Sequence, residues 1–109
     1  MIFENTIYNV DCLEGLRNLP DKSIDLIVTD PPYINNTVGG GKPLNIIQTL
    51  IFNSSSEGDI VLDPFIGSGT TAVAAMKEKR KYLGFEIEPK YFNIAKKKIE
   101  NEQRQLNLF

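Results

Sequence analysis

Two short strings in this sequence carry the residue types that could do chemistry. The first is Asp30-Pro31-Pro32-Tyr33, and the second occupies residues 63–71. Two successive prolines force an extended, rigid backbone, so the Asp30 carboxylate and the Pro31 carbonyl become fixed acceptors, with Tyr33 as a fixed aromatic face. The first string therefore predicts a site that holds a hydrogen-bond donor beside a flat ring.

The second string reads Asp63-Pro64-Phe65-Ile66-Gly67-Ser68-Gly69-Thr70-Thr71. A buried strand ending at Asp63, a Gly-x-Gly turn and a helix opening with Thr70-Thr71 point backbone N–H groups and a positive helix end at an anionic ligand. Glu86 ends the next strand, where a carboxylate can accept from ribose hydroxyls. This pattern fits NAD, FAD or S-adenosylmethionine, and it also fits a glycine turn that only packs a helix onto a sheet.

Composition excludes several other kinds of chemistry. The chain of 109 residues is 41% hydrophobic and 24% charged, which predicts one soluble domain. Its net charge of −2 argues against binding nucleic acid by bulk electrostatics. Because Cys12 is the only cysteine and histidine is absent, disulfides, Cys/His zinc sites and histidine triads are excluded, and we expect no metal.

The elements that must position these residues alternate along the chain. Apolar runs predict strands over 6–10, 24–29, 60–62 and 81–87, and helical spacing predicts helices over 12–19, 44–52, 67–79 and 89 to about 102. The expected fold is α/β, a three-layer, Rossmann-like sheet of four mostly parallel strands. No secretory signal or membrane-spanning run is evident, so we expect a cytoplasmic protein.

Together the two strings resemble those of the amino-group DNA methyltransferases, which modify adenine N6 or cytosine N4. Further stretches that look like the family's are 9–16, 19–21, 23–27, 42–44 and 81–86, so the resemblance covers nearly the whole chain. The first string precedes the glycine loop, as in the β arrangement of these enzymes. Aspartate instead of serine at position 30 resembles the adenine-N6 version.

The resemblance implies a role for each site residue. Asp30, Pro31, Pro32 and Tyr33 form the catalytic motif, in which two acceptors favour a pyramidal amine and the tyrosine stacks on a flipped base. S-adenosylmethionine is the implied cofactor, with its ribose on Glu86 and its adenine near Asp11 and Cys12. The residues implied at its methionine end are Asp63, Phe65, Gly67, Gly69 and Thr70, with Thr71 beside them.

The chain departs from the family between the two strings, where the β arrangement carries further strands and a target-recognition region. Here 34–43 is a short linker that reaches at most about 33 Å. We therefore predict one minimal domain, 1–109, in which 1–33 carries the catalytic motif and 44–104 binds the cofactor. If family order holds, the strands lie in the order 6–10, 81–87, 60–62, 24–29.

The predicted order leaves the strand at 24–29 as an apolar sheet edge, and we expect a homodimer formed through or near it. The tail 105–109 resembles the peptide with which bacterial proteins dock onto the replication sliding clamp, and it also fits a frayed helix end. Three functions stay open: a DNA adenine-N6 methyltransferase core with DNA selection lost or supplied by a partner, a non-catalytic cofactor-binding or scaffold module, and a nicotinamide-binding fragment.

Overall fold

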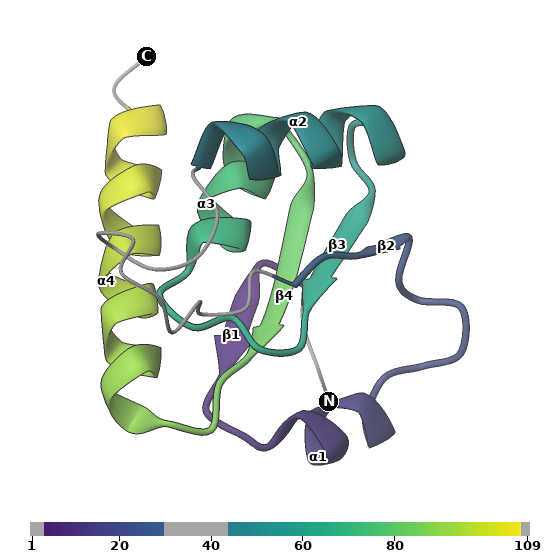
Figure 1. Ribbon diagram of the computed structural model, residues 1–109, viewed down its shortest axis with the longest axis vertical. Helices are drawn as coiled ribbons and strands as arrows, with labels where there is room; N and C mark the ends of the chain where they lie inside the picture. The colour runs from purple at the N-terminus through teal and green to yellow at the C-terminus, as the bar shows by residue number, and fades with distance from the viewer. Residues whose placement is uncertain (1–3, 30–43, 108–109) are drawn as a thin grey trace.

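A computed structural model describes residues 4–29 and 44–107 of the chain (Figure 1). The string 30–33, predicted to be the catalytic motif, and the predicted linker 34–43 lie outside the described residues. The elements alternate as predicted: β1 Thr6–Tyr8, α1 Cys12–Arg17, β2 Leu26–Ile27, α2 Leu44–Ser54, β3 Ile60–Asp63, α3 Thr70–Lys77, β4 Lys81–Phe85 and α4 Pro89–Leu106.

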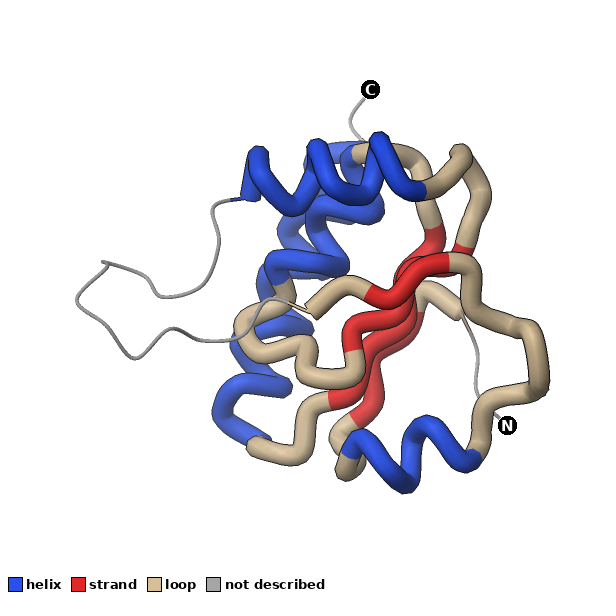
Figure 2. The backbone as a smooth tube through the Cα atoms, turned by 45° about the vertical axis from the view of Figure 1, so that its right-hand side comes forward, coloured by secondary structure: helices blue, strands red, loops and turns tan. Residues whose placement is uncertain are grey.

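The four strands form one parallel sheet in the order β1-β4-β3-β2, which confirms the predicted order. Helices α2, α3 and α4 cover one face and α1 covers the other, so the three-layer prediction is also confirmed (Figure 2). The larger core lies under the three helices, with Ile47, Ile51 and Val61 at its centre. A smaller core of Leu62, Leu83 and Phe85 lies on the α1 side.

The strand predicted over 24–29 is shorter than expected. Val28 N donates to Leu62 O at 2.9 Å, but at the other end the Asp25 side chain accepts from Ile60 N at 2.8 Å. Asp25 N also donates to Ile60 O at 3.0 Å, so Asp25 bonds to Ile60 through both its backbone and its side chain, and β2 contains only Leu26 and Ile27. A strand with a neighbour on one side has no second ladder to extend it.

The bounds of α3 and α4 also differ from the prediction. The helix expected from Gly67 begins at Thr70, because Gly67 and Gly69 have φ angles of 55° and 93° that no α-helix accommodates. Helix α4 runs through Leu106, so the first two residues of the tail 105–109 are helical, and residues 108–109 lie outside the described part. Within 4–29 and 44–107, no helix is long and apolar enough to span a bilayer.

Candidate functional site

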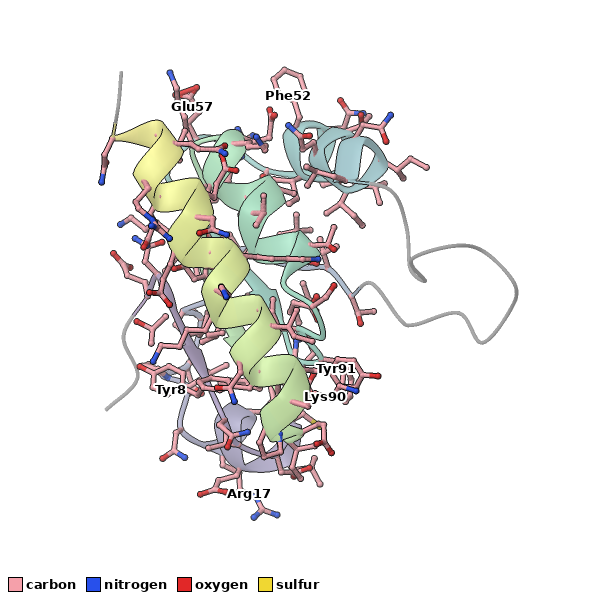
Figure 3. All side chains as sticks on the ribbon, turned by 90° about the vertical axis from the view of Figure 1, so that its left-hand side faces the viewer. Tyr8, Arg17, Phe52, Glu57, Lys90 and Tyr91 are labelled. Carbon is pink, nitrogen blue, oxygen red and sulfur yellow. The ribbon has the colours of Figure 1, made fainter. Side chains whose placement is uncertain are left out.

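The predicted cofactor residues gather at the carboxyl edge of the sheet. Because β1, β4 and β3 are parallel neighbours, the loops that follow them leave the sheet at the same edge. Figure 3 shows that α1, with Arg17, and the first turn of α4, with Lys90 and Tyr91, share one end of the molecule, while Phe52 and Glu57 lie at the other. The site is therefore built from three loops at the α1 end.

The loop between β3 and α3 is a tight turn held by hydrogen bonds that its backbone amides donate. Asp63 Oδ1 accepts from Phe65 N at 2.9 Å, Ile66 N donates to Phe85 O at 2.9 Å, and Gly69 N donates to Ile66 O at 2.9 Å. A Cβ at Gly69 would lie 3.1 Å from the Cα and Cβ of Ala95 in α4. Glycine at this position therefore serves both the left-handed backbone and the close approach of the loop to α4.

Helix α3 presents uncapped amides at this edge. Its N-cap is Gly69, and no side chain among the described residues caps the helix. The first amides of an α-helix have no intrahelical acceptor, and together with the helix dipole they attract an anionic group. Thr70 and Thr71 supply the first two of these amides.

Glu86 connects two of the loops through its side chain. Its Oε1 accepts from Gly67 N at 2.9 Å, and its Oε2 accepts from Glu88 N at 3.0 Å, just before α4 begins. The side chain is half-buried, and a carboxylate has about four acceptor positions, so Glu86 can accept further hydrogen bonds from a ligand. The glycine loop and the start of α4 are thus fixed around an acceptor at the end of β4.

The loop after β1 brings in the residues predicted near an adenine. Asp11 is the N-cap of α1, and its Oδ2 accepts from Leu13 N at 3.0 Å, while Cys12 begins the helix and is half-buried. Sequence reasoning missed Asn9, whose Nδ2 donates to Glu86 O at 2.7 Å and to Ile87 O at 3.1 Å. In the sequence, Asn9 lies inside the strand predicted over 6–10, and its only signal was a stretch that resembled the family's.

Exposure separates the predicted residues into two groups. Phe65 is 55% exposed, and Ile87, which follows Glu86, is 65% exposed, so both offer apolar surface near the loop. Asp63 is fully buried and Thr71 is 1% exposed. Within the described residues, the Asp63 side chain acts on the Phe65 amide rather than opening to solvent, and the Thr71 hydroxyl has no hydrogen-bond partner.

Thr70 lies partly on a different surface from Glu86. It lines a cavity of about 290 Å³ between α2, α3 and α4, together with Leu44 and Asn101. The structure therefore brings Gly67 and Glu86 into direct contact at the sheet edge, and it places the Thr70 side chain toward the helical layer. No cluster of acidic, cysteine or histidine side chains able to hold a metal occurs in the described ranges.

These groups fit the cofactor that the family resemblance implies. S-adenosylmethionine carries a carboxylate, which suits free helix amides, and ribose hydroxyls, which suit a carboxylate acceptor such as Glu86. Its adenine has flat, apolar ring faces, and Phe65 and Ile87 offer exposed apolar surface near the loop. Strand β2 is parallel to β3, so the chain also leaves β2 at this edge.

Comparison with solved structures supports this architecture. A DNA modification methylase from Thermus thermophilus, crystallised with S-adenosyl-L-methionine, superposes with a TM-score of 0.54 and 43% identity over 56% of this chain and 25% of its own. The crystal structure of M1.HpyAVI superposes with a TM-score of 0.70 over 85% of this chain and 97% of its own, at 20% identity. The second likeness shows that the fold is shared.

Sequence relatives point the same way. The type II methyltransferase M2.DpnII of Streptococcus pneumoniae is 44% identical over 56% of this chain and 23% of its own length. The type II methyltransferase M.BglI of Bacillus subtilis is 52% identical over 53% of this chain and 17% of its own length. The chain spans only about a quarter or less of the length of these curated relatives. A family model described as DNA methylase matches residues 40–97, more than half of the sequence, and the chain therefore belongs to the N6/N4 DNA methylase family.

Proposed function

We propose that this chain is the cofactor-binding and catalytic core of an S-adenosylmethionine-dependent DNA methyltransferase, with adenine N6 as the acceptor. The observation that carries the proposal is the position of the Glu86 carboxylate. It touches the Gly67 amide at 2.9 Å, and its own backbone is held by Tyr8 at the end of β1 and by Asn9 in the loop that follows. A single acceptor thus stands where the three loops of the site meet.

Each part of the site has a defined task in this proposal. The first amides of α3 bind the cofactor's carboxylate, Glu86 accepts from its ribose hydroxyls, and Asp11 and Cys12 border its adenine. The bound cofactor supplies a methyl group on a sulfonium. Asp30 and the Pro31 carbonyl accept the N–H groups of the target amine, Pro32 keeps the motif rigid, and Tyr33 stacks on the base.

Calorimetric titration with S-adenosylhomocysteine and with NAD tests the cofactor assignment. We expect S-adenosylhomocysteine to bind and NAD not to bind. Glu86→Gln keeps the size of the side chain and one acceptor for Gly67 N, but it removes the charge that strengthens hydrogen bonds to ribose. A hydrogen bond to a charged group contributes about 1.5–3 kcal/mol, so affinity should fall roughly 10- to 150-fold. Equal binding of NAD, or equal affinity of the variant, would contradict the assignment.

Transfer of labelled methyl from S-adenosylmethionine to DNA tests catalysis separately. We expect transfer by the wild-type chain to be abolished by Asp30→Ala, with cofactor affinity unchanged. The competing function is a non-catalytic cofactor-binding module, which the short linker 34–43 and the net charge of −2 favour. Cofactor binding without any transfer, with or without Asp30, would establish that alternative.

We further infer that the β2 edge of the sheet forms a homodimer. Ile27 in β2 is 61% exposed, and no described strand pairs with the outer side of β2. Helix α2 covers the face of the sheet on which Leu26 packs, and it contains no charged residue. Gln48 donates to Glu78 at the end of α3, so Ile46 and Leu50 lie on the flank of α2 that points away from α3.

We call the exposed side chains Ile27, Ile46 and Leu50 the α2–β2 surface. It suits a second copy of the chain, because two neutral, apolar surfaces related by a twofold axis meet without like-charge repulsion. Ile46 and Leu50 are 45% and 40% exposed. Sedimentation at micromolar concentration should show a dimer that Leu50→Lys dissociates. The matched control is Ile94→Lys on α4. Ile94 is 38% exposed, and α4 contacts β1, the strand at the opposite edge of the sheet, so this variant should leave the dimer intact. A wild-type monomer would refute the inference.

A further inference from the structure

Asn9 makes a fork of two hydrogen bonds across the site. Its Nδ2 donates to Glu86 O at 2.7 Å and to Ile87 O at 3.1 Å, although these residues are 77 and 78 positions away in the sequence. An amide nitrogen carries two N–H donors, and both are used here on successive carbonyls. The loop after β1 is therefore fastened to the chain immediately after β4.

The fork acts on the backbone that carries the Glu86 carboxylate. On the amino side of the residue, Glu86 N donates to Tyr8 O at 3.0 Å, and on the carboxyl side Asn9 holds the Glu86 and Ile87 carbonyls. Both peptide groups of Glu86 are thus fixed by residues 8 and 9. The direction in which the side chain leaves the backbone follows from these bonds, because both flanking peptide planes are set.

The Glu86 side chain in turn holds two other parts of the site. It accepts from Gly67 N in the glycine loop and from Glu88 N at the start of α4. A change in the backbone at Glu86 would therefore move the carboxylate away from the glycine loop. Among the described residues, Asn9 is exposed and packs in neither core, so core packing does not account for this side chain.

We infer that Asn9 is a positioning residue for the cofactor site: its side-chain amide fixes the backbone of Glu86 and Ile87 and thereby aims the Glu86 carboxylate at the ribose hydroxyls. The inference rests on the proposed function, because it assumes that Glu86 binds the ribose of S-adenosylmethionine. It adds that the loop after β1 controls ribose binding through Glu86, in addition to its predicted place near the adenine.

The test is a double-mutant cycle on S-adenosylhomocysteine affinity, measured by calorimetry on the full chain. Asn9→Ala should weaken binding about tenfold, a value typical for the loss of one or two positioning hydrogen bonds. In a Glu86→Gln background the same substitution should weaken binding less than threefold, because the charged group that Asn9 positions is already absent. A general loss of stability would instead lower affinity equally in both backgrounds.

Three further variants keep the test interpretable. Asn9→Asp has the same shape but no donor and places a carboxylate against two carbonyl oxygens, so it should bind at least as weakly as Asn9→Ala. Asn9→Ser keeps one donor on a shorter side chain and should fall between wild type and Asn9→Ala. Asn53→Ala, at an exposed asparagine in α2, should leave affinity unchanged.

The outcomes separate the two proposals. If the wild-type chain does not bind S-adenosylhomocysteine, the proposed function fails. If the wild type binds and Asn9→Ala binds equally well, or if its penalty is the same with Glu86→Gln, the role of Asn9 is refuted while the cofactor assignment stands. If Asn9→Ala does not fold, the comparison of Asn9→Ser with Asn9→Asp decides, since only the serine variant should retain part of the affinity.

Discussion

Replacing Gly69 by alanine tests whether the glycine loop is shaped by its contact with α4. Gly69 has a φ of 93°, and a Cβ there would lie 3.1 Å from the Cα and Cβ of Ala95 and 3.3 Å from its carbonyl oxygen. A left-handed backbone costs an alanine about 1–2 kcal/mol, and forcing a methyl into a packed contact costs about 1–3 kcal/mol more. We therefore expect Gly69→Ala to lower the free energy of unfolding by about 2–5 kcal/mol.

Gly58 provides a matched control within the same chain. Its φ of 88° is nearly that of Gly69, but a Cβ there would have no atom within 4 Å. Gly58→Ala should therefore show the backbone cost alone, about 1–2 kcal/mol. In urea unfolding, the difference between the two variants measures the contact with Ala95. S-adenosylhomocysteine affinity should fall at least tenfold in Gly69→Ala and stay unchanged in Gly58→Ala.

A second substitution checks the source of the difference. Ala95→Gly removes the methyl group that faces Gly69, at a cost of about 1 kcal/mol for a glycine inside a helix. In that background, part of the extra penalty of Gly69→Ala should disappear, because the two positions share one contact. Equal penalties for Gly58→Ala and Gly69→Ala would refute the reasoning, since the loop would then owe nothing to its packing on α4.

Three further substitutions test the packing of the helices and the sheet. Arg80 is buried and donates to Ser55 Oγ at 2.9 Å and Ser55 O at 2.6 Å, so Arg80→Lys should lower the free energy of unfolding in urea by about 2–3 kcal/mol, because an ammonium cannot reproduce this fork. Glu102 lies 3.2 Å from Lys77, and Glu102→Gln should cost about 1 kcal/mol at low salt and less at high salt, since the lysine is 34% exposed. Burial raises the pKa of Tyr82 above 10.0, so wild-type stability should fall as pH rises past the unfolded value, and Tyr82→Phe should flatten that fall in alkaline urea titrations; an unchanged slope would contradict it.

The sheet order was predictable because it came with the resemblance to the amino-group DNA methyltransferases, and the observed order agrees with it. Strand and helix ends were less predictable, since they depend on single competing hydrogen bonds. The Asp25 side chain accepts from Ile60 N just before β2 begins, and two left-handed glycines delay α3 until Thr70. Helix α4 continues from the predicted end near residue 102 to Leu106, and hydrophobic spacing does not detect that Glu102 is buried against Lys77.

The sequence predicted local features of the candidate site, but not the contacts between loops that lie far apart in the sequence. At the carboxyl ends of β3 and β4, Glu86 contacts Gly67. Which side chains face a ligand depends on loops far apart in the sequence, so the full burial of Asp63 and the fork from Asn9 to residues 86–87 were not foreseen. The catalytic string 30–33 stays a prediction.

The strand order separates the proposed cofactor site from the β2 edge of the sheet. The three loops around Glu86 come from β1, β4 and β3, which are consecutive neighbours in the sheet, so none of them depends on β2 or on residues beyond it. A parallel connection from β2 back to β3 needs a crossover of about a dozen residues, and α2 with residues 55–59 is the described part of this connection. Whatever a longer family member inserts between its two motifs would therefore join the sheet at the β2 edge. Cofactor affinity and DNA selection should accordingly separate: variants on the α2–β2 surface should change assembly and DNA methylation, while S-adenosylhomocysteine affinity should follow Asn9, Gly69 and Glu86.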